Sequence, residues 1–182
     1  MWKKVSLVVS GVLLCGGLAL GQTSLEQMVK EGEASWVLGT WKGTTENGTE
    51  ITLQTRWDLK RQIIVLRGTV GEYQFLGITS VNPLSGQVEY TGFDSRGGRS
   101  KGSWDSDGQN LILTVEGTSP NGETHKVAFV FVKKERNKMD VELHEVDQWG
   151  YPVYPARGKI TLTKQKRTPR AHGRKARKAQ QQ

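Results

Sequence analysis

The chain has 182 residues, a single cysteine and a formal net charge of +8, from 26 Lys and Arg against 18 Asp and Glu. This length favours one domain with an ordinary hydrophobic core, and a hydrophobic content of 35 % argues against a wholly disordered chain. No apolar run reaches the roughly 18–20 residues of a membrane span, and 22 glycines against 5 prolines favour many short strands over a helical bundle.

The first 21 residues are typical of a secretory signal peptide. Lys3 and Lys4 precede an apolar stretch that ends in the small-x-small sequence Ala-Leu-Gly at 19–21. We expect cleavage before Gln22 and export to the periplasm or the cell exterior. Lipidation at Cys15 and an uncleaved anchor are the alternatives. Cleavage would remove Cys15, so the mature protein would have no thiol for a disulfide or a thiolate metal site.

Residues 22–34 are predicted to contain a short helix. Ser24 is the expected N-cap, and Gln27 follows at the spacing of a capping box. Leu25, Met28 and Val29 would share one face, which suits a helix lying across the mouth of a barrel.

From residue 35 onward the hydrophobic pattern changes to a period of two. Ile51, Leu53, Thr55 and Trp57 share one face of the clearest example, as in a half-buried antiparallel strand. Turns rich in Gly and Asn separate the strands and favour neighbour-to-neighbour pairing. We therefore predict an all-β fold, an antiparallel up-and-down barrel, with a sandwich or a filled barrel as the alternatives. About ten strands are expected, at 35–44, 49–57, 61–70, 73–82, 86–93, 99–104, 109–118, 123–133, 138–146 and 157–164.

The segment 35–43, SWVLGTWKG, resembles the Gly-x-Trp opening of lipocalin-like and fatty-acid-binding-like (calycin) barrels. That resemblance implies that Trp41 closes the bottom of the barrel. Further motifs resemble an uncharacterised bacterial family of secreted lipocalin-like domains, although Tyr90-Thr91 stand where a Ser-Trp pair is expected. The resemblance covers a domain of residues 35–163 and implies no known reaction. Its motifs are Arg56-Trp57-Asp58, Gly77-Ile78-Thr79, Asn82-Pro83, Gly86-Gln87, Gly92-Phe93-Asp94-Ser95, Gly97-Gly98 and Gly102-Ser103-Trp104.

Aromatic residues on the predicted inner faces are the candidate ligand-binding lining, with simple core packing as the alternative. They are Trp57, Tyr73, Phe75, Tyr90, Phe129 and Phe131. The segment 147–155, rich in aromatics and proline, is predicted to be a loop that caps the barrel mouth or packs over its end.

No group of residues makes a convincing catalytic or metal site. Ser100 lies in a Gly-x-Ser-x-Gly pattern, but no helix follows it as a nucleophile elbow requires. Asp140, Glu142 and His144 share one strand face, which is interpreted as a solvated outer face, with an acid–base or cation site as the alternative. Asp105-Ser106-Asp107-Gly108 is interpreted as a hairpin turn and not as a calcium loop.

We expect neither an enzyme nor a cofactor. The alternative is haem, for which His125 is the better axial candidate because it shares a face with Val127 and Phe129.

The C-terminal segment 164–182 is predicted to be a disordered basic tail. It carries eight basic residues and no acidic one, which leaves residues 22–163 with a formal charge of −2. We expect a non-catalytic barrel that binds a small apolar or amphipathic ligand. The alternative is an envelope-associated module whose tail binds an anionic polymer or a membrane surface, without specific nucleic-acid recognition. The tail residues concerned are Lys164, Lys166, Arg167, Arg170, Arg174, Lys175, Arg177 and Lys178.

Overall fold

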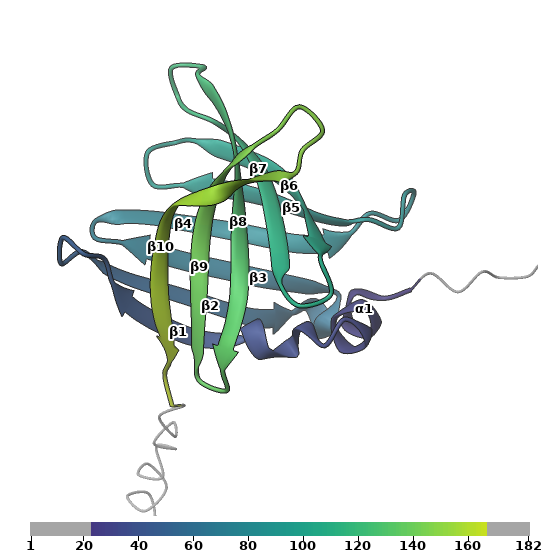
Figure 1. The fold of residues 1–182 in the computed structure, drawn as a ribbon. Coiled ribbons are helices and arrows are strands. Elements are labelled where there is room, and N and C mark those ends of the chain that lie inside the picture. The colour runs from purple at the N-terminus through teal and green to yellow at the C-terminus, as the bar shows by residue number, and fades with distance from the viewer. Residues whose placement is uncertain (1–22, 167–182) are drawn as a thin grey trace, which may run out of the picture.

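The computed structural model describes residues 23–166, which form a ten-stranded closed barrel with a short helix at one end (Figure 1). Each strand pairs antiparallel with its neighbour in sequence, and β1 (Gly39–Thr44) closes the ring by pairing with β10 (Pro152–Lys164). The predicted all-β up-and-down barrel of ten strands is therefore confirmed, and the sandwich alternative is excluded. The predicted signal peptide and most of the predicted tail lie outside the described residues.

The remaining elements follow one another with short connections. They are α1 (Leu25–Glu31), η1 (Ala34–Val37), β2 (Glu50–Asp58), η2 (Leu59–Arg61), β3 (Ile63–Val70), β4 (Tyr73–Val81), β5 (Val88–Asp94), β6 (Arg99–Ser106), β7 (Leu111–Thr118), β8 (Thr124–Glu135) and β9 (Lys138–Val146).

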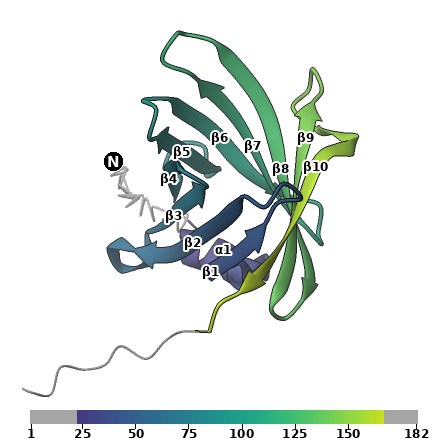
Figure 2. The same ribbon diagram turned by 90° about the vertical axis from the view of Figure 1, so that its left-hand side faces the viewer.

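The barrel is flattened, because β8, β9 and β10 run steeply across β2, β3 and β4 (Figures 1 and 2). Side chains alternate between the interior and the outer surface along each strand. The alternation predicted for β2 is present, since Leu53 and Thr55 are buried while Gln54 and Arg56 are exposed. An up-and-down order places the turns after β1, β3, β5, β7 and β9 at one end of the barrel, which we call the open end.

Helix α1 covers the opposite end, as the sequence pattern suggested. The Ser24 side chain accepts a hydrogen bond from the Gln27 backbone N–H at 3.2 Å, which is the expected N-cap. The Gln27 side chain donates forward to Glu31 at 2.8 Å. Leu25 is 2 % exposed, and Glu26 forms an ion pair with Arg61 that ties the helix to the barrel.

Several predicted strand boundaries are wrong by one or more residues, among them the starts of the segments predicted at 35–44, 61–70 and 157–164. Residues 35–38 belong to η1 and the turn after it, because the Trp41 indole N–H donates to the Val37 carbonyl at 2.9 Å and bends the chain there. Residue 61 belongs to η2. Asp58 is the N-cap of η2, and its side chain accepts a hydrogen bond from the Leu59 N–H at 2.7 Å. Strand β10 begins at Pro152 and not at residue 157, with a register shift between Val153 and Gly158.

Glycines on the inner wall make room for aromatic rings. A Cβ atom on Gly68 would lie 2.0 Å from the Phe75 ring, and one on Gly77 would lie 2.1 Å from the Tyr90 ring. Gly68 is the direct cross-strand partner of Phe75. Both rings therefore lie close against the backbone of a neighbouring strand, so they take up little of the space inside the barrel.

Candidate ligand-binding cavity

The barrel encloses a cavity of ≈ 660 Å³ that reaches the open end. This volume lies within the range of about 300–1,000 Å³ that is usual for small-molecule sites. The filled-barrel alternative is therefore excluded. Most of the side chains that line the cavity are aliphatic or aromatic. The aliphatic ones are Ile51, Leu53, Leu66, Val70, Leu113, Val115, Val127, Val141, Leu143, Ile160 and Leu162.

Five of the six aromatic residues that the sequence analysis singled out line this cavity: Tyr73, Phe75, Tyr90, Phe129 and Phe131. Trp57 does not, and that prediction is corrected. Trp57 lies at the end of β2 opposite Ile64, where it is half-buried. Trp41 is 1 % exposed in the core beside η1, on the β1 strand that closes the barrel.

A floor separates this cavity from a smaller one of ≈ 250 Å³ beneath α1. Leu66 and Phe131 line both spaces. Phe131 packs against Trp104 with ring centroids 5.4 Å apart, and the Trp104 indole N–H donates to the Thr79 hydroxyl at 2.9 Å. The hydrogen bond satisfies the one polar atom of the indole, so Trp104 leaves no unpaired polar atom in the floor.

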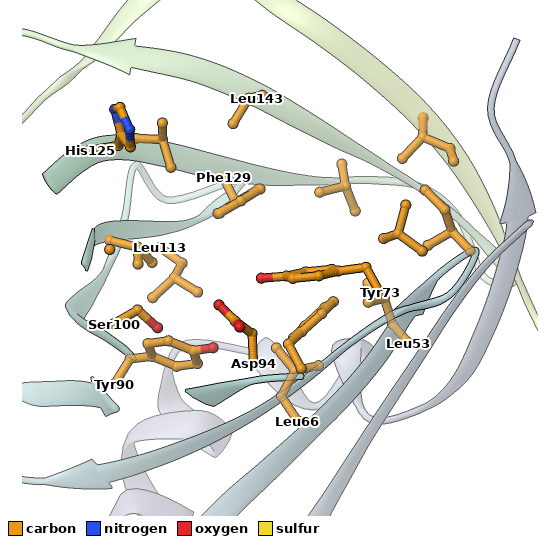
Figure 3. A pocket seen from close by; sticks show the side chains of 18 of the residues that line it. Leu53, Leu66, Tyr73, Tyr90, Asp94, Ser100, Leu113, His125, Phe129 and Leu143 are labelled. Atoms are coloured by element: carbon orange, nitrogen blue, oxygen red, sulfur yellow. The ribbon is translucent and has the colours of Figure 1, made fainter. Parts of the chain in front are cut away.

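One wall of the cavity carries polar groups from β4, β5 and β6. Figure 3 shows the hydroxyls of Tyr73 and Tyr90, the carboxylate of Asp94 and the hydroxyl of Ser100 gathered together, with His125, Phe129 and Leu143 on the opposite side. Tyr73 hydrogen-bonds Asp94, and Tyr90 hydrogen-bonds Ser100. Burial raises the pKa of both tyrosines, and Asp94 raises that of Tyr73 further, so both remain neutral phenols at neutral pH.

Asp94 also anchors the turn between β5 and β6. Its Oδ1 accepts the backbone N–H groups of Arg96 at 2.8 Å and Gly98 at 3.0 Å. Desolvation raises the pKa of Asp94, but these two hydrogen bonds and the one from Tyr73 together outweigh it, so the pKa is lowered overall. Asp94 is therefore ionised at neutral pH. The sequence analysis missed it as a lining residue, although it shares the inward parity of Tyr90 and Gly92.

The lowered pKa of Asp94 predicts an acid-dependent contribution to stability. A carboxylate with a depressed folded-state pKa stabilises the fold above its unfolded pKa, about 3.9, and this contribution disappears as the pH falls through the folded-state value. We expect Asp94→Asn to be less stable than the parent at pH 7 and to approach the parent in stability at an acidic pH well below about 3.9. Urea unfolding at both pH values measures this, and a constant difference would contradict it.

The other candidate catalytic residues are dispersed. Ser100 and His125 line the cavity, whereas Asp140, Glu142 and His144 lie on the outer face of β9, so the five do not meet in one cleft. The prediction that this outer face is solvated is wrong, since Asp140 is 4 % and His144 is 0 % exposed.

The irregular start of β10 covers this outer face. The Val153 carbonyl lies 2.9 Å from His144 Nδ1, and the Tyr154 ring packs edge-on to the imidazole with centroids 4.6 Å apart. Glu142 lies 3.3 Å from His144 Nε2. Asp140 accepts a hydrogen bond from Thr161 at 2.7 Å, with Lys134 and Lys159 at 3.8 and 3.9 Å.

The aromatic segment 147–155 lies against the outside of the barrel and not over the cavity. Asp147 Oδ1 accepts the N–H groups of Trp149 and Tyr151 at 2.9 and 2.8 Å, which fixes the turn. The Thr114 hydroxyl on the outer face of β7 reaches the Gly150 carbonyl at 3.4 Å. The prediction that this segment caps the mouth or the end of the barrel is therefore wrong. A backbone carbonyl of this turn, that of Gly150, accepts a hydrogen bond from the outer face instead.

Only the start of the predicted tail is described. The prediction that Lys164 belongs to the disordered tail is wrong, because this residue is part of β10. Its ammonium group donates to the Trp36 carbonyl at 3.0 Å and lies 5.0 Å from the centre of the Trp41 ring. Burial lowers the pKa of Lys164. Lys166 is exposed. The other six basic residues, Arg167, Arg170, Arg174, Lys175, Arg177 and Lys178, lie outside the described residues.

No family model and no curated protein matches the chain. Within residues 23–166, no helix is long and apolar enough to cross a membrane. The same residues contain no group of three or more His, Cys, Asp or Glu side chains placed to hold a metal ion.

Proposed function

We propose that this protein is a secreted or periplasmic, non-catalytic barrel of lipocalin-like type that binds a small apolar or amphipathic molecule. The observation that carries the proposal is the ≈ 660 Å³ cavity, whose lining is apolar apart from one polar wall and a few groups at its mouth. Removing apolar ligand surface from water stabilises a complex by about 25 cal/mol per Å² before the costs of association.

Several features of the cavity support this proposal over simple core packing. Gly117 and Gly158 line it, and a Cβ atom on Gly158 would meet no heavy atom within 4 Å. The rings of Phe75 and Tyr90 lie close against glycines instead of filling the centre. The arrangement leaves the middle of the barrel open. Close packing is the rule in protein interiors, so an apolar space of this size is typical of a ligand site.

Binding of a neutral dye tests the proposal directly. We expect Nile red to bind the purified protein with one site per chain and with a blue-shifted, enhanced emission, because the dye enters an apolar environment. Native mass spectrometry and solvent extraction of the same preparation are expected to reveal a co-purified small molecule. Absence of saturable dye binding to folded protein, together with an empty extract, would overturn the proposed function.

A further inference from the structure

The polar wall of the cavity is defined by Tyr73, Tyr90, Asp94 and Ser100, and it is the part of the site that can recognise a specific ligand end. Three of its four groups are neutral hydroxyls and the fourth is an ionised carboxylate. Among residues 23–166, Asp94 is the only Asp or Glu that lines the cavity.

Glycines shape this wall around its oxygen atoms. A Cβ atom on Gly92 would lie 2.3 Å from Ser100 Oγ and 2.7 Å from the Tyr90 hydroxyl, and one on Gly98 would lie 2.2 Å from Asp94 Oδ2. Larger residues at either position would displace the polar groups. The backbone of β5 and of the turn before β6 is therefore compatible with this set of oxygens, because it carries glycine at both points.

Asp94 has accepting capacity beyond its role in the turn. A carboxylate offers about four lone-pair positions. Two backbone N–H groups use Oδ1, and the Tyr73 hydroxyl uses one further position. Asp107, in the turn between β6 and β7, also accepts three hydrogen bonds, but none of them comes from a group that lines the cavity. Its Oδ1 accepts from the N–H groups of Gln109 and Asn110, and its Oδ2 accepts from the Asn110 side chain at 2.8 Å, all within one turn.

Two positive residues, Arg99 and Lys159, are among those that line the cavity, and the charge of Arg96 contributes to the lowered pKa of Asp94. The Arg96 guanidinium lies 5.3 Å from the centre of the Tyr73 ring, and that of Arg99 lies 5.9 Å from the centre of the exposed Phe93 ring. Lys159 is directed to Asp140 on the outer face, at 3.9 Å. The Asp94 carboxylate and the hydroxyl oxygens therefore belong to the wall itself, whereas the guanidinium groups of Arg96 and Arg99 lie against aromatic rings.

We propose that this polar wall selects apolar ligands whose polar end carries a hydrogen-bond donor, an ammonium or a hydroxyl group, over ligands that end in a carboxylate. The inference rests on the proposed function and specifies its ligand class. A carboxylate at the wall would bring a second negative charge beside Asp94, whereas an ammonium group would gain a charge-assisted hydrogen bond. A hydroxyl group would donate to Asp94 without a charge of its own.

The test is displacement of Nile red by three ligands with the same dodecyl chain: dodecylammonium, dodecan-1-ol and dodecanoate, each below its micellar concentration at pH 7. We expect dodecylammonium to bind at least about tenfold more tightly than dodecanoate, with dodecan-1-ol between them. After cleavage before Gln22 the chain would carry a net charge of +6, from −2 in residues 22–163 and +8 in residues 164–182, which attracts dodecanoate at long range, so the opposite order reports the local site.

Asp94→Asn is the informative variant, because the amide oxygen of Asn still accepts the two backbone N–H groups of the turn. We expect this variant to lose most of the ammonium preference and to keep its affinity for dodecan-1-ol within about threefold, a change of less than 1 kcal/mol. Asp107→Asn is the matched control, since it makes the same chemical change in another turn that lines none of the cavities. We expect it to behave as the parent.

The outcomes separate the two proposals. If the protein binds Nile red and dodecanoate displaces the dye as well as dodecylammonium does, the proposed ligand class is overturned. The proposed function would still be supported by the dye binding. A ligand order that Asp94→Asn does not change overturns the role of the wall. If Asp94→Asn does not fold, the order of the three ligands on the parent protein decides. Failure of the dye and of all three ligands to bind overturns the proposed function itself.

Discussion

Replacing Trp41 by alanine is expected to destabilise the protein by about 3–5 kcal/mol, the usual cost of removing a large buried aromatic side chain. Trp41 is 1 % exposed and packs in the core cluster with Leu53 and Leu162. Its indole N–H holds the Val37 carbonyl at 2.9 Å, and Lys164 lies over its ring. The alanine variant therefore loses core packing and the contact that joins η1 to the β1–β10 closure.

Chemical unfolding followed by circular dichroism measures this effect. Trp149→Ala is the matched control, because Trp149 is 74 % exposed and its loss is expected to change the free energy of unfolding by no more than about 0.5 kcal/mol. Trp41→Phe keeps an aromatic ring in the core but removes the hydrogen bond. Its free energy of unfolding is therefore expected to decrease by less than that of the alanine variant. An alanine variant within 1 kcal/mol of the parent would show that Trp41 does not support the closure as described.

Filling the cavity is expected to abolish ligand binding without unfolding the barrel. Gly117 and Gly158 line the cavity, neither has a left-handed backbone, and an added Cβ meets a backbone oxygen at 3.9 Å at Gly117 and nothing at Gly158. A phenylalanine side chain at either position has room to enter the cavity. We expect each substitution to weaken Nile red binding by about tenfold and the double variant by about a hundredfold.

Thr163→Phe controls for the added aromatic surface. Thr163 is exposed on the outer face of β10, on the strand that also carries Gly158. This variant is expected to bind Nile red as the parent does. If the folded double variant also bound the dye with parental affinity, the dye would be bound outside the barrel, and the cavity would no longer support the proposed function.

The local pattern of the sequence was sufficient to predict the barrel. Alternation in segments such as 51–57 and 127–131 specifies which side chains point inward, because successive residues of a strand face opposite sides. Gly- and Asn-containing turns specify neighbour pairing. The helix N-cap at Ser24 was also predictable, since it depends only on residues within the first turn.

Boundaries failed where a side-chain contact determined the backbone. Residues 35–38 read as strand, but the bond from the Trp41 indole to Val37 holds them in η1. Residues 152–156 read as loop, but β10 begins at Pro152 because that segment pairs with β9 and covers His144. Neither contact follows from the alternation of polar and apolar residues on which the strand prediction depends.

The sequence by itself determined the strand order, the inward faces and five of the six aromatic side chains that line the cavity. Only the tertiary structure decided that the barrel is hollow, because the volume left inside depends on how close Phe75 and Tyr90 lie to Gly68 and Gly77. The structure alone also brought Asp94 to Tyr73 and Tyr90. Side-chain parity predicts the face on which a group lies, but not its distance from a group on another strand.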